Sequence, residues 1–376
     1  MKLLMAAPYY YPRIGGVEIY ARQLGIALRD LEGWEIVVVT SNEAGRSDIE
    51  DSVDGMKVCR LGTWGKLSNT PLGPLWPVKI RSIIRQERPD LILAHTPVPS
   101  MADAVALAAG RVPFLLAYHA ATLLKAGSPV FNGIARAYHT YERVSLSRAS
   151  RILAVSEYVQ EQLPASVHDK TIVLPNAVWE RDIRVRDQPT DTNFLFISSL
   201  DRTHAWKGLD LILQAIVRYR EAYGSSAELT VLGDGNNRGH FEAAAHGLGL
   251  AGTVRFCGWQ TGSAKEAAFE RATALVLYPT TENDAFPTVM LEAWARGVPV
   301  VASRIGALPT LISEGQDGFL AAPHNPGALA GVLHRVAVTS PAERHRIAAT
   351  AARRTRELYT WERQARDFAR LASNLG

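Results

Sequence analysis

The sequence predicts an α/β protein built from two doubly wound parallel sheets that follow one another along the chain. Short, nearly continuous runs of Val, Ile and Leu recur, each followed by an amphipathic segment, a pattern typical of parallel strands joined by crossover helices. The pattern pauses in the polar, highly charged stretch 179–192 and then restarts. The length of 376 residues allows two to three domains at about 150 residues each.

The first series defines an expected N-terminal domain over residues 1–182. Its first apolar run stops at Pro8, which makes it shorter than the apolar core of about 7 residues that a signal peptide needs, so we interpret it as a buried strand. The expected strands are 2–7, 36–40, 91–95, 114–119, 152–156 and 171–174. Helices are expected at 17–28, 79–86 and 158–163.

The second series defines an expected C-terminal domain over residues 183–357, and a final helix, 358–376, is expected to pack back on the first domain. Sheets of this kind bind ligands beyond the carboxyl ends of their strands, so two facing domains would form one cleft. The expected strands are 194–198, 228–232, 254–257, 274–278 and 299–303. Helices are expected at 209–219, 241–246, 264–271, 289–296, 342–358 and 361–375.

The composition is that of a soluble globular protein, with 47% apolar and 21% charged residues, which excludes disordered, collagen-like and coiled-coil classes. The net charge is +4 and each half carries +2, so neither half predicts a nucleic-acid-binding domain. No apolar run reaches the roughly 18 residues of a membrane-spanning helix. Cys59 and Cys257 are expected to be small core residues in a reducing compartment, which points to a cytoplasmic protein.

Two glycine pairs follow predicted strands and precede predicted helices. Gly15 and Gly16 open a helix, where free amides and the helix dipole favour an anion, although a tight turn explains them equally well. Gly233 and Gly235 resemble a dinucleotide fingerprint, but the spacing to Gly239 is one residue too long. A phosphate-side turn and plain backbone geometry both remain open for this second pair.

Charged residues occur at the same predicted edges. Arg202 and Lys207 follow the first strand of the second half and could clamp a diphosphate, whereas an isolated loop cation is usually only solvated. Asp284 and Glu292 lie eight residues apart at the start of a helix, where helix capping is the alternative. His119 ends a strand and could shuttle a proton, bind a sugar hydroxyl or serve a structural role. No metal-binding motif is present.

Taken together and in this order, these segments resemble the retaining nucleotide-sugar glycosyltransferases of family 4, which have the two-Rossmann GT-B fold. The resemblance covers nearly the whole chain. It is carried in the first half by 15–18, His119, 155–157 and 174–178, and in the second half by 207–208, 233–235, 254–258, 291–293, 297–303, 306–309 and 317–320.

The resemblance implies roles for individual residues. Lys207 and Arg202 would hold the donor diphosphate, Glu292 the ribose hydroxyls, and Asp284, which stands where the family has Glu, the donor sugar. His119 matches the active-site histidine. Further donor contacts are implied for Gly15, Gly16, Gly233, Gly235, Trp259, Gln260, Phe286, Pro287, Thr288 and Val289.

The implied activity is metal-independent transfer of a hexose, with retention, from a UDP- or GDP-sugar to a hydroxyl acceptor, with no cofactor. A lipid-linked or polysaccharide acceptor is favoured, because the basic stretch 136–151 could meet an anionic membrane surface, although a solvated helix face also explains that stretch. Three alternatives stay open: a tailoring enzyme for small molecules, a phosphorylase or a sucrose- or trehalose-type synthase, and a nucleotide-sugar-binding subunit without turnover.

Overall fold

The computed structural model describes residues 1–376 except 68–69, 121–132, 134–137, 139–141, 225–226 and 376. The chain divides into two compact units: an N-terminal unit of Met1–Ala177 with Trp361–Gly376, and a C-terminal unit of Val178–Thr360. The contacts thus assign residues 178–182 to the C-terminal unit, although the expected boundary lies at 182/183. They assign the helix that begins at Trp361 to the N-terminal unit.

The N-terminal unit is built on an eight-stranded sheet in the order β10-β9-β8-β7-β1-β2-β4-β3. Every described pairing is parallel except that of β3 with β4. Since the strand order reverses between β1 and β7, this pair marks the point where doubly wound sheets bind ligands. The strands are β1 (Lys2–Ala6), β2 (Glu35–Asn42), β3 (Ile49–Val53), β4 (Met56–Gly62), β7 (Leu91–Thr96), β8 (Phe114–Tyr118), β9 (Arg151–Ala154) and β10 (Thr171–Val173).

Four strands of this unit were not predicted. The edge strand β3 pairs antiparallel with its neighbour β4, and β3 is mostly exposed, so it lacks the continuous apolar run of a central strand. The short hairpin β5 (Gly65–Leu67) and β6 (Thr70–Leu72) forms a separate two-stranded sheet. Cys59 lies on β4 and is buried, as predicted.

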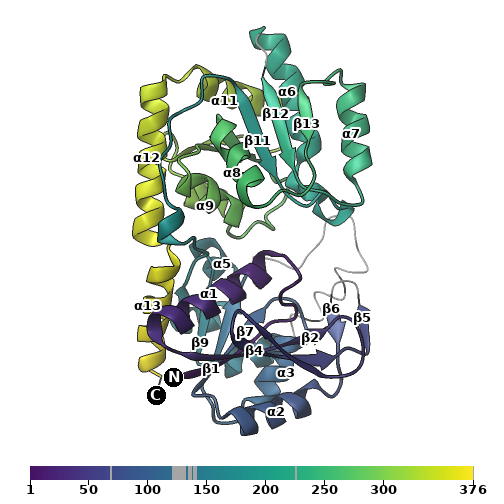
Figure 1. Cartoon of the computed structure of the whole chain (residues 1–376), viewed down its shortest axis with the longest axis vertical. Coiled ribbons are helices and arrows are strands. Elements are labelled where there is room, and N and C mark those ends of the chain that lie inside the picture. The colour runs from purple at the N-terminus through teal and green to yellow at the C-terminus, as the bar shows by residue number, and fades with distance from the viewer. Residues whose placement is uncertain (68–69, 121–132, 134–137, 139–141, 225–226, 376) are drawn as a thin grey trace. The chain divides into compact units, whose positions relative to one another are not determined.

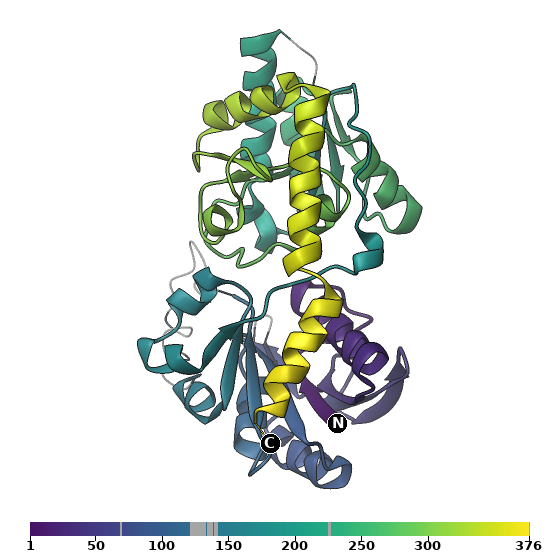
Figure 2. The same cartoon turned by 90° about the vertical axis from the view of Figure 1, so that its left-hand side faces the viewer.

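Helices cover both faces of the N-terminal sheet (Figure 1). Helix α13 packs along α1, as Figure 2 shows in yellow and purple, and the rings of Trp34 and Phe368 meet edge to face at 5.8 Å. Helices α2 and α3 pack together on the other face. The helices are α1 (Gly16–Glu32), α2 (Trp76–Glu87), α3 (Met101–Ala108), α5 (Glu157–Gln162), η1 (Ala165–Lys170) and α13 (Trp361–Ser373).

The C-terminal unit is built on a six-stranded, fully parallel sheet in the order β13-β12-β11-β14-β15-β16. Here the strand order reverses between β11 and β14, so the loops after these two strands meet at the ligand-binding point of the sheet. The strands are β11 (Asn193–Ile197), β12 (Glu228–Leu232), β13 (Val254–Phe256), β14 (Ala274–Leu277), β15 (Val300–Ser303) and β16 (Gly318–Ala321).

Two groups of helices cover this second sheet. Helix α6 packs against α11 over a core that includes Ile212, Ile216 and Leu333, and α9 packs against α12. Among the described helices, none combines the length and apolar character that crossing a membrane requires. The helices are η2 (Glu180–Asp182), η3 (Arg202–Lys207), α6 (Leu209–Tyr223), α7 (Arg238–Gly247), α8 (Gly262–Arg271), α9 (Thr288–Ala295), α10 (Leu308–Leu311), α11 (Pro326–Val338) and α12 (Pro341–Leu358).

Candidate active site

An ion pair lies at the position where the strand order of the C-terminal sheet reverses. Lys207 ends η3, which follows β11, and Asp284 lies in the loop after β14. Lys207 Nζ is 2.7 Å from Asp284 Oδ2, and the two side chains are only 21% and 12% exposed. The structure therefore brings together two residues that lie 77 positions apart in sequence, at the edge where this fold binds its ligands.

The main chain around Lys207 is held close to β14. Gly208 has φ +80°, and a Cβ atom on it would lie 2.0 Å from the carbonyl oxygen of Tyr278, so no larger residue fits. The amide of Thr280 donates to the carbonyl oxygen of Trp206 at 2.7 Å. Lys207 Nζ also lies 4.4 Å from the ring centre of Trp206. These contacts fix the position of the ammonium group.

Asp201 and Asn236 form a reciprocal pair that joins the loop after β11 to the loop after β12. The amide of Asn236 donates to Asp201 Oδ1, and the amide of Arg202 donates to Asn236 Oδ1, both at 2.9 Å. The hydroxyl of Ser199 donates to Asp201 Oδ2. The Asn236 amide and the Ser199 hydroxyl hold the pKa of Asp201 below its usual value. The side chain of Arg202 is exposed beside this pair.

The loops after β11 and β12 lie so close together that only glycine fits at the predicted positions Gly233 and Gly235. Their φ angles are +146° and +157°. A Cβ atom would lie 1.8 Å from the carbonyl oxygen of Ser198 at Gly233 and 2.5 Å from the amide nitrogen of Asp201 at Gly235. Backbone geometry therefore explains both glycines, because they allow the loop after β12 to pack against the cation-bearing loop after β11.

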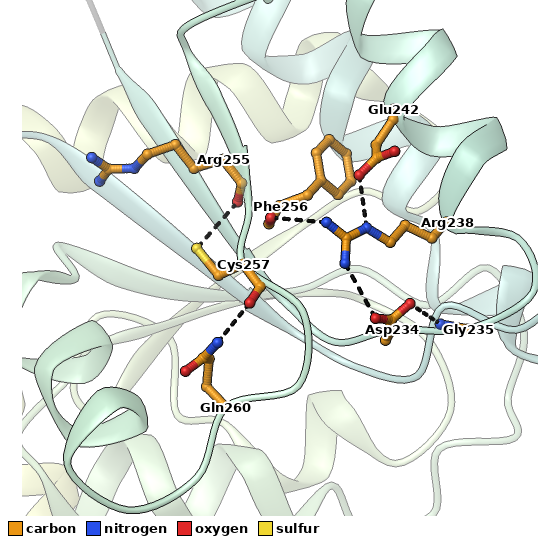
Figure 3. Close-up of polar contacts among 8 residues, drawn as sticks. All are labelled: Asp234, Gly235, Arg238, Glu242, Arg255, Phe256, Cys257 and Gln260. Carbon is orange, nitrogen blue, oxygen red and sulfur yellow. Dashed lines mark hydrogen bonds and ion pairs between the residues drawn. The ribbon is translucent and has the colours of Figure 1, made fainter.

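Arg238 connects the loop after β12 to the end of β13 (Figure 3). Its guanidinium donates to Asp234 Oδ2 and to the carbonyl oxygen of Phe256, each at 3.2 Å, and to Glu242 Oε1 at 2.7 Å. Because Asp234 lies in the loop after β12 and Phe256 ends β13, this one side chain joins the loop to the neighbouring strand. The amide of Gly233 adds a bond of 2.8 Å to the carbonyl oxygen of Gly258.

Two of the predicted donor contacts, Trp259 and Gln260, follow β13 closely in the sequence. Trp259 is 60% exposed, and Gln260 Nε2 donates to the carbonyl oxygen of Cys257 at 2.6 Å (Figure 3). The prediction that Cys257 is a core residue is wrong: its side chain is exposed, because it follows β13, the edge strand of the sheet. An exposed indole at this edge offers a flat apolar face to a ligand.

The predicted helix start lies at α9, with Pro287 as its N-cap residue and the amides of Thr288 and Val289 in its first turn. First-turn amides have no partner within their helix, so they are available to an anion. The ring of Phe286 is buried and meets the ring of Tyr359 edge to face at 5.4 Å, so only its main chain could contact a ligand. Glu292, inside α9, pairs with Lys265 of α8 at 2.7 Å.

In the N-terminal unit, Gly15 and Gly16 begin α1 as predicted, but a carboxylate lies beside them. A Cβ atom on Gly15 would be 2.3 Å from Glu18 Oε2. Burial raises the pKa of Glu18, while its own amide and Arg13, at 3.4 Å, oppose the shift. The acid next to Gly15 favours hydroxyl groups over phosphate as ligands of this turn.

His119 directly follows β8 and forms a hydrogen bond with a second histidine. His119 Nε2 lies 2.9 Å from Nδ1 of His95, and the two rings are stacked with 5.1 Å between their centres. Tyr20 of α1 meets both rings edge to face. Burial lowers the pKa of His119 to about 3, and burial together with His119 lowers that of His95 well below its usual value. A neutral His119 suits a polar contact better than a proton shuttle.

The predicted site residues thus divide between the two units. The N-terminal unit contains Gly15, Gly16 and His119, and the remainder lie in the C-terminal unit, on the loops that follow β11 to β14 and in α9. In the part of the chain that the structure describes, no three His, Cys, Asp or Glu side chains group together as a metal site would need. Five contributing residues were not predicted: His95, Asp201, Asn236, Arg238 and Lys265. Of these, only His95 shows the feature by which His119 was predicted, since both are polar residues at the end of a strand.

Comparison with known proteins identifies the family. Residues 14–179 match the family described as Glycosyltransferase Family 4, and residues 191–337 match the one described as Glycosyl transferases group 1. A phosphatidyl-myo-inositol mannosyltransferase from Mycolicibacterium smegmatis is 26% identical over 340 residues, which cover 89% of this chain and 84% of that protein.

Solved structures show the same fold. A sucrose-phosphate synthase from Thermosynechococcus elongatus superposes with a TM-score of 0.79 at 19% identity, covering 100% of this chain and 99% of that one. HepE from Anabaena, solved in complex with UDP-glucose, superposes with a TM-score of 0.75 at 19% identity and covers both chains completely. With both units matched by family and by fold, the chain belongs to the family 4 glycosyltransferases and has the GT-B fold.

Proposed function

We propose that this glycosyltransferase moves a hexose from a UDP- or GDP-sugar to a hydroxyl acceptor, with retention and without a metal. The proposal rests on the Lys207–Asp284 pair, which lies where the strand order of the C-terminal sheet reverses. The pair supports the proposal because a cation suited to a diphosphate lies beside a carboxylate suited to sugar hydroxyls. The UDP-glucose bound by HepE supports a donor of this type.

The proposed chemistry follows from where charge develops. When the bond between the sugar C1 atom and the diphosphate oxygen breaks, negative charge grows on the leaving group. Lys207, Arg202 and the first-turn amides of α9 would stabilise that charge, as fixed cations and amide dipoles do in enzymes. The leaving phosphate takes the proton of the incoming hydroxyl, whose oxygen bonds to C1 on the same face. No enzymic nucleophile is needed.

The two carboxylates would divide the rest of the donor between them. Asp284 would accept hydrogen bonds from sugar hydroxyls beside the diphosphate, and Glu292, inside the helix α9 that follows, from the ribose. Both have an ammonium partner, Lys207 at 2.7 Å and Lys265 at 2.7 Å. Carboxylate oxygens accept hydrogen bonds, so both side chains are suited to hydroxyl groups.

Donor binding and turnover are tested together on one panel. Isothermal titration against UDP- and GDP-sugars, paired with hydrolysis and transfer assays, separates a transferase from a binding subunit. Lys207→Ala should weaken binding of the matching nucleoside diphosphate by roughly 1.5–3 kcal/mol, the range for a charged hydrogen bond. Lys170→Ala, in the other unit, is the control. Unchanged affinity in Lys207→Ala removes Lys207 from the site, and tight binding with no turnover favours the binding subunit.

The stereochemical course has a direct readout. NMR of the transfer product should show the same anomeric configuration at C1 as in the donor. An inverted configuration would rule out the same-face mechanism and would require a general base on the opposite face of the sugar.

We propose a lipid-linked acceptor and contact with an anionic membrane surface. The relative named above acts on phosphatidyl-myo-inositol, which supports a lipid acceptor. Of the basic stretch 136–151, residues Arg136 and His139 lie outside the described part of the chain. A different surface, on the hairpin β5–β6 and the start of α2, supports the membrane contact.

This apolar–basic surface combines exposed large apolar side chains with cations. Five such side chains are 41–70% exposed within fifteen residues, and Arg46 lies 5.7 Å from the ring centre of the indole among them. Residues 55–86 contain six basic and no acidic residues, and four of the six form ion pairs with carboxylates outside this range: Lys57, Arg60, Lys66 and Lys79. Apolar side chains with basic neighbours are typical of membrane-interface surfaces. The apolar members are Trp64, Leu67, Leu72, Leu75 and Val78, and the exposed cations of α2 are Arg81 and Arg85.

Vesicle flotation tests the membrane contact. The protein should float with vesicles that contain anionic phospholipid, and the triple variant Trp64→Ser/Leu67→Ser/Val78→Ser should not. The matched control, Leu248→Ser/Val338→Ser, removes exposed apolar side chains from the other unit and should leave flotation unchanged. If the unaltered protein does not float, the membrane contact is wrong and a soluble small-molecule acceptor is favoured.

A further inference from the structure

The hydrogen bond between His95 and His119 allows only two arrangements of protons. At 2.9 Å, one of the nitrogens, His95 Nδ1 or His119 Nε2, must carry the hydrogen and the other must present its lone pair. If His95 donates, the hydrogen of a neutral His119 is on Nδ1. If His119 donates, its Nδ1 is bare and the hydrogen of His95 moves to Nε2.

The surroundings of His95 distinguish the two arrangements. His95 is completely buried, and its Nε2 atom has no hydrogen-bond partner among the described residues. A buried N–H group without an acceptor is rarer in proteins than a buried acceptor without a donor. The arrangement in which Nε2 of His95 is a bare lone pair is therefore favoured, and it requires His95 to donate from Nδ1.

Nothing else in the contacts of His95 reverses this preference. Its strand β7 pairs with β8 through His95 and Ala117, and the amide of His119 donates to the carbonyl oxygen of Thr96 at 3.1 Å. Tyr20 presents a ring edge, and its hydroxyl lies 3.5 Å from the carbonyl oxygen of Leu174. The main chain of the two strand ends thus holds the rings together while supplying no acceptor to His95 Nε2.

We infer that His95 is a positioning residue: by donating from Nδ1 to Nε2 of His119, it fixes His119 in the tautomer that carries its hydrogen on Nδ1. His119 then acts as a neutral hydrogen-bond donor with a set orientation. This role rests on the proposed function, in which His119 contacts the donor substrate, and it specifies the polarity of that contact: the substrate atom bound by Nδ1 is an oxygen that accepts. A sugar hydroxyl oxygen or a phosphate oxygen satisfies this requirement.

The tautomer can be read without any substrate. Long-range ¹H–¹⁵N NMR of the ¹⁵N-labelled protein distinguishes a protonated from a bare ring nitrogen, and His119→Gln and His95→Asn assign the signals. We expect His119 to show Nδ1 protonated and Nε2 bare, without change between about pH 5 and 8, the range over which an ordinary histidine titrates. A hydrogen on Nε2 of His119, or a doubly protonated ring in this range, would overturn the inference.

Two near-isosteric replacements reverse the polarity of the bond. In His95→Asn, the side-chain amide can still donate from the place of Nδ1, so His119 should keep its tautomer and transfer should stay within about threefold. In His95→Asp, the carboxylate can only accept, so the hydrogen of His119 should move to Nε2. Transfer should then fall about 10- to 100-fold, as when a partner that orients a functional group is lost.

The outcomes separate the inference from the proposed function. Equal transfer by folded Asn and Asp variants, or equal loss in both, would contradict a role for bond polarity. If His95→Asp does not fold, the tautomer of the unaltered protein and of His95→Asn still decides the question. If the tautomer is as expected but no nucleotide sugar is turned over, the proposed function fails and the positioning of His119 stands.

Discussion

Asp284 carries two opposing effects at the level of single residues. It holds Lys207 in place through a contact of 2.7 Å, yet it also puts a negative charge beside the atom that would bind a diphosphate. The carboxylate of Asp284 contacts the ammonium group directly. Asp284 should therefore disfavour the free diphosphate while favouring the intact donor, whose sugar offers it hydroxyl groups.

Asp284→Asn should change these two affinities in opposite directions. Binding of free UDP or GDP should strengthen by about 1 kcal/mol, roughly fivefold, because Lys207 loses its competitor. Transfer from the sugar donor should fall. Titration calorimetry and initial-rate assays measure the two effects, and Asp284→Glu is the conservative control. Weaker nucleotide binding in Asp284→Asn would show that the carboxylate orders Lys207 and does not compete for it.

The pair of His95 and His119 makes stability depend on pH. Burial lowers the pKa of His119 to about 3 and that of His95 well below an unfolded value near 6.5, so the unfolded chain binds more protons between these values. The stabilisation that depends on the neutral rings should be complete above about pH 6.5. As the pH falls below this value, the free energy of unfolding should decrease by about 1.4 kcal/mol per pH unit for each ring.

Urea denaturation at a series of pH values measures this slope. The variant His95→Asn/His119→Asn retains the carboxylates but lacks both rings, so its free energy of unfolding should fall less steeply below about pH 6.5. Parallel slopes for the two proteins would show that the histidines are protonated in the folded protein.

At the level of elements, the candidate donor site depends on loops that hold one another. The loop after β11 bears Arg202 and Lys207, and it is joined to the loop after β12 by the reciprocal bonds of Asp201 and Asn236. The second loop is in turn joined to the end of β13 by Arg238. A change in the middle of this series should therefore affect nucleotide binding without touching the ligand.

Asp201→Ala removes the acceptor of both the Asn236 amide and the Ser199 hydroxyl. We expect nucleoside diphosphate affinity to fall by about 1 kcal/mol, the scale of one hydrogen bond, because the cation-bearing loop becomes less ordered. Asp201→Asn, which keeps an acceptor oxygen, should recover part of the loss. Affinity unchanged in Asp201→Ala would mean that the glycines alone position the loop.

The sequence predicted those elements whose physical signal is local. Central strands such as β1 and β12 are continuous apolar runs because both of their faces are covered, and a run of that kind needs no knowledge of its neighbours. Strands β3 and β5 are exposed and have no continuous apolar run, and only their pairing partners make them strands. The same limit applied to Cys257: its exposure follows from the edge position of β13, which depends on the order of strands in the sheet.

The candidate site shows the same division between local and non-local information. Lys207, Asp284 and His119 could be predicted because polar residues at strand ends point to the ligand-binding edge. The pairings could not be predicted, since the bonds from Lys207 to Asp284 and from the Arg202 amide to Asn236 join residues 77 and 34 positions apart. Separation along the sequence, more than residue type, therefore limited which contacts of the site could be predicted.

At the level of the whole molecule, the candidate donor residues are concentrated in one unit, and hydrogen exchange can test this assignment. A saturating nucleoside diphosphate should slow amide exchange in residues 198–208, 233–238, 257–260 and 284–292. Exchange in the sheet of the N-terminal unit should be unchanged, because ligand binding stabilises the elements that hold the ligand. Protection centred on Gly15, Gly16 and His119 would move the nucleotide to the other unit.

The assignment of Trp361–Ser373 to the N-terminal unit has a consequence for how the protein is made. As the chain leaves the ribosome, α1 appears early, but α13, which covers it, appears only after the entire C-terminal unit. Domains generally fold as units and N-terminal first during synthesis. In this protein the N-terminal unit stays incomplete while the C-terminal unit is translated, because the face that receives Phe368 is still uncovered. The order of translation and the order of domain completion are therefore reversed, and a stop codon near residue 360 would harm the half of the protein that is made first.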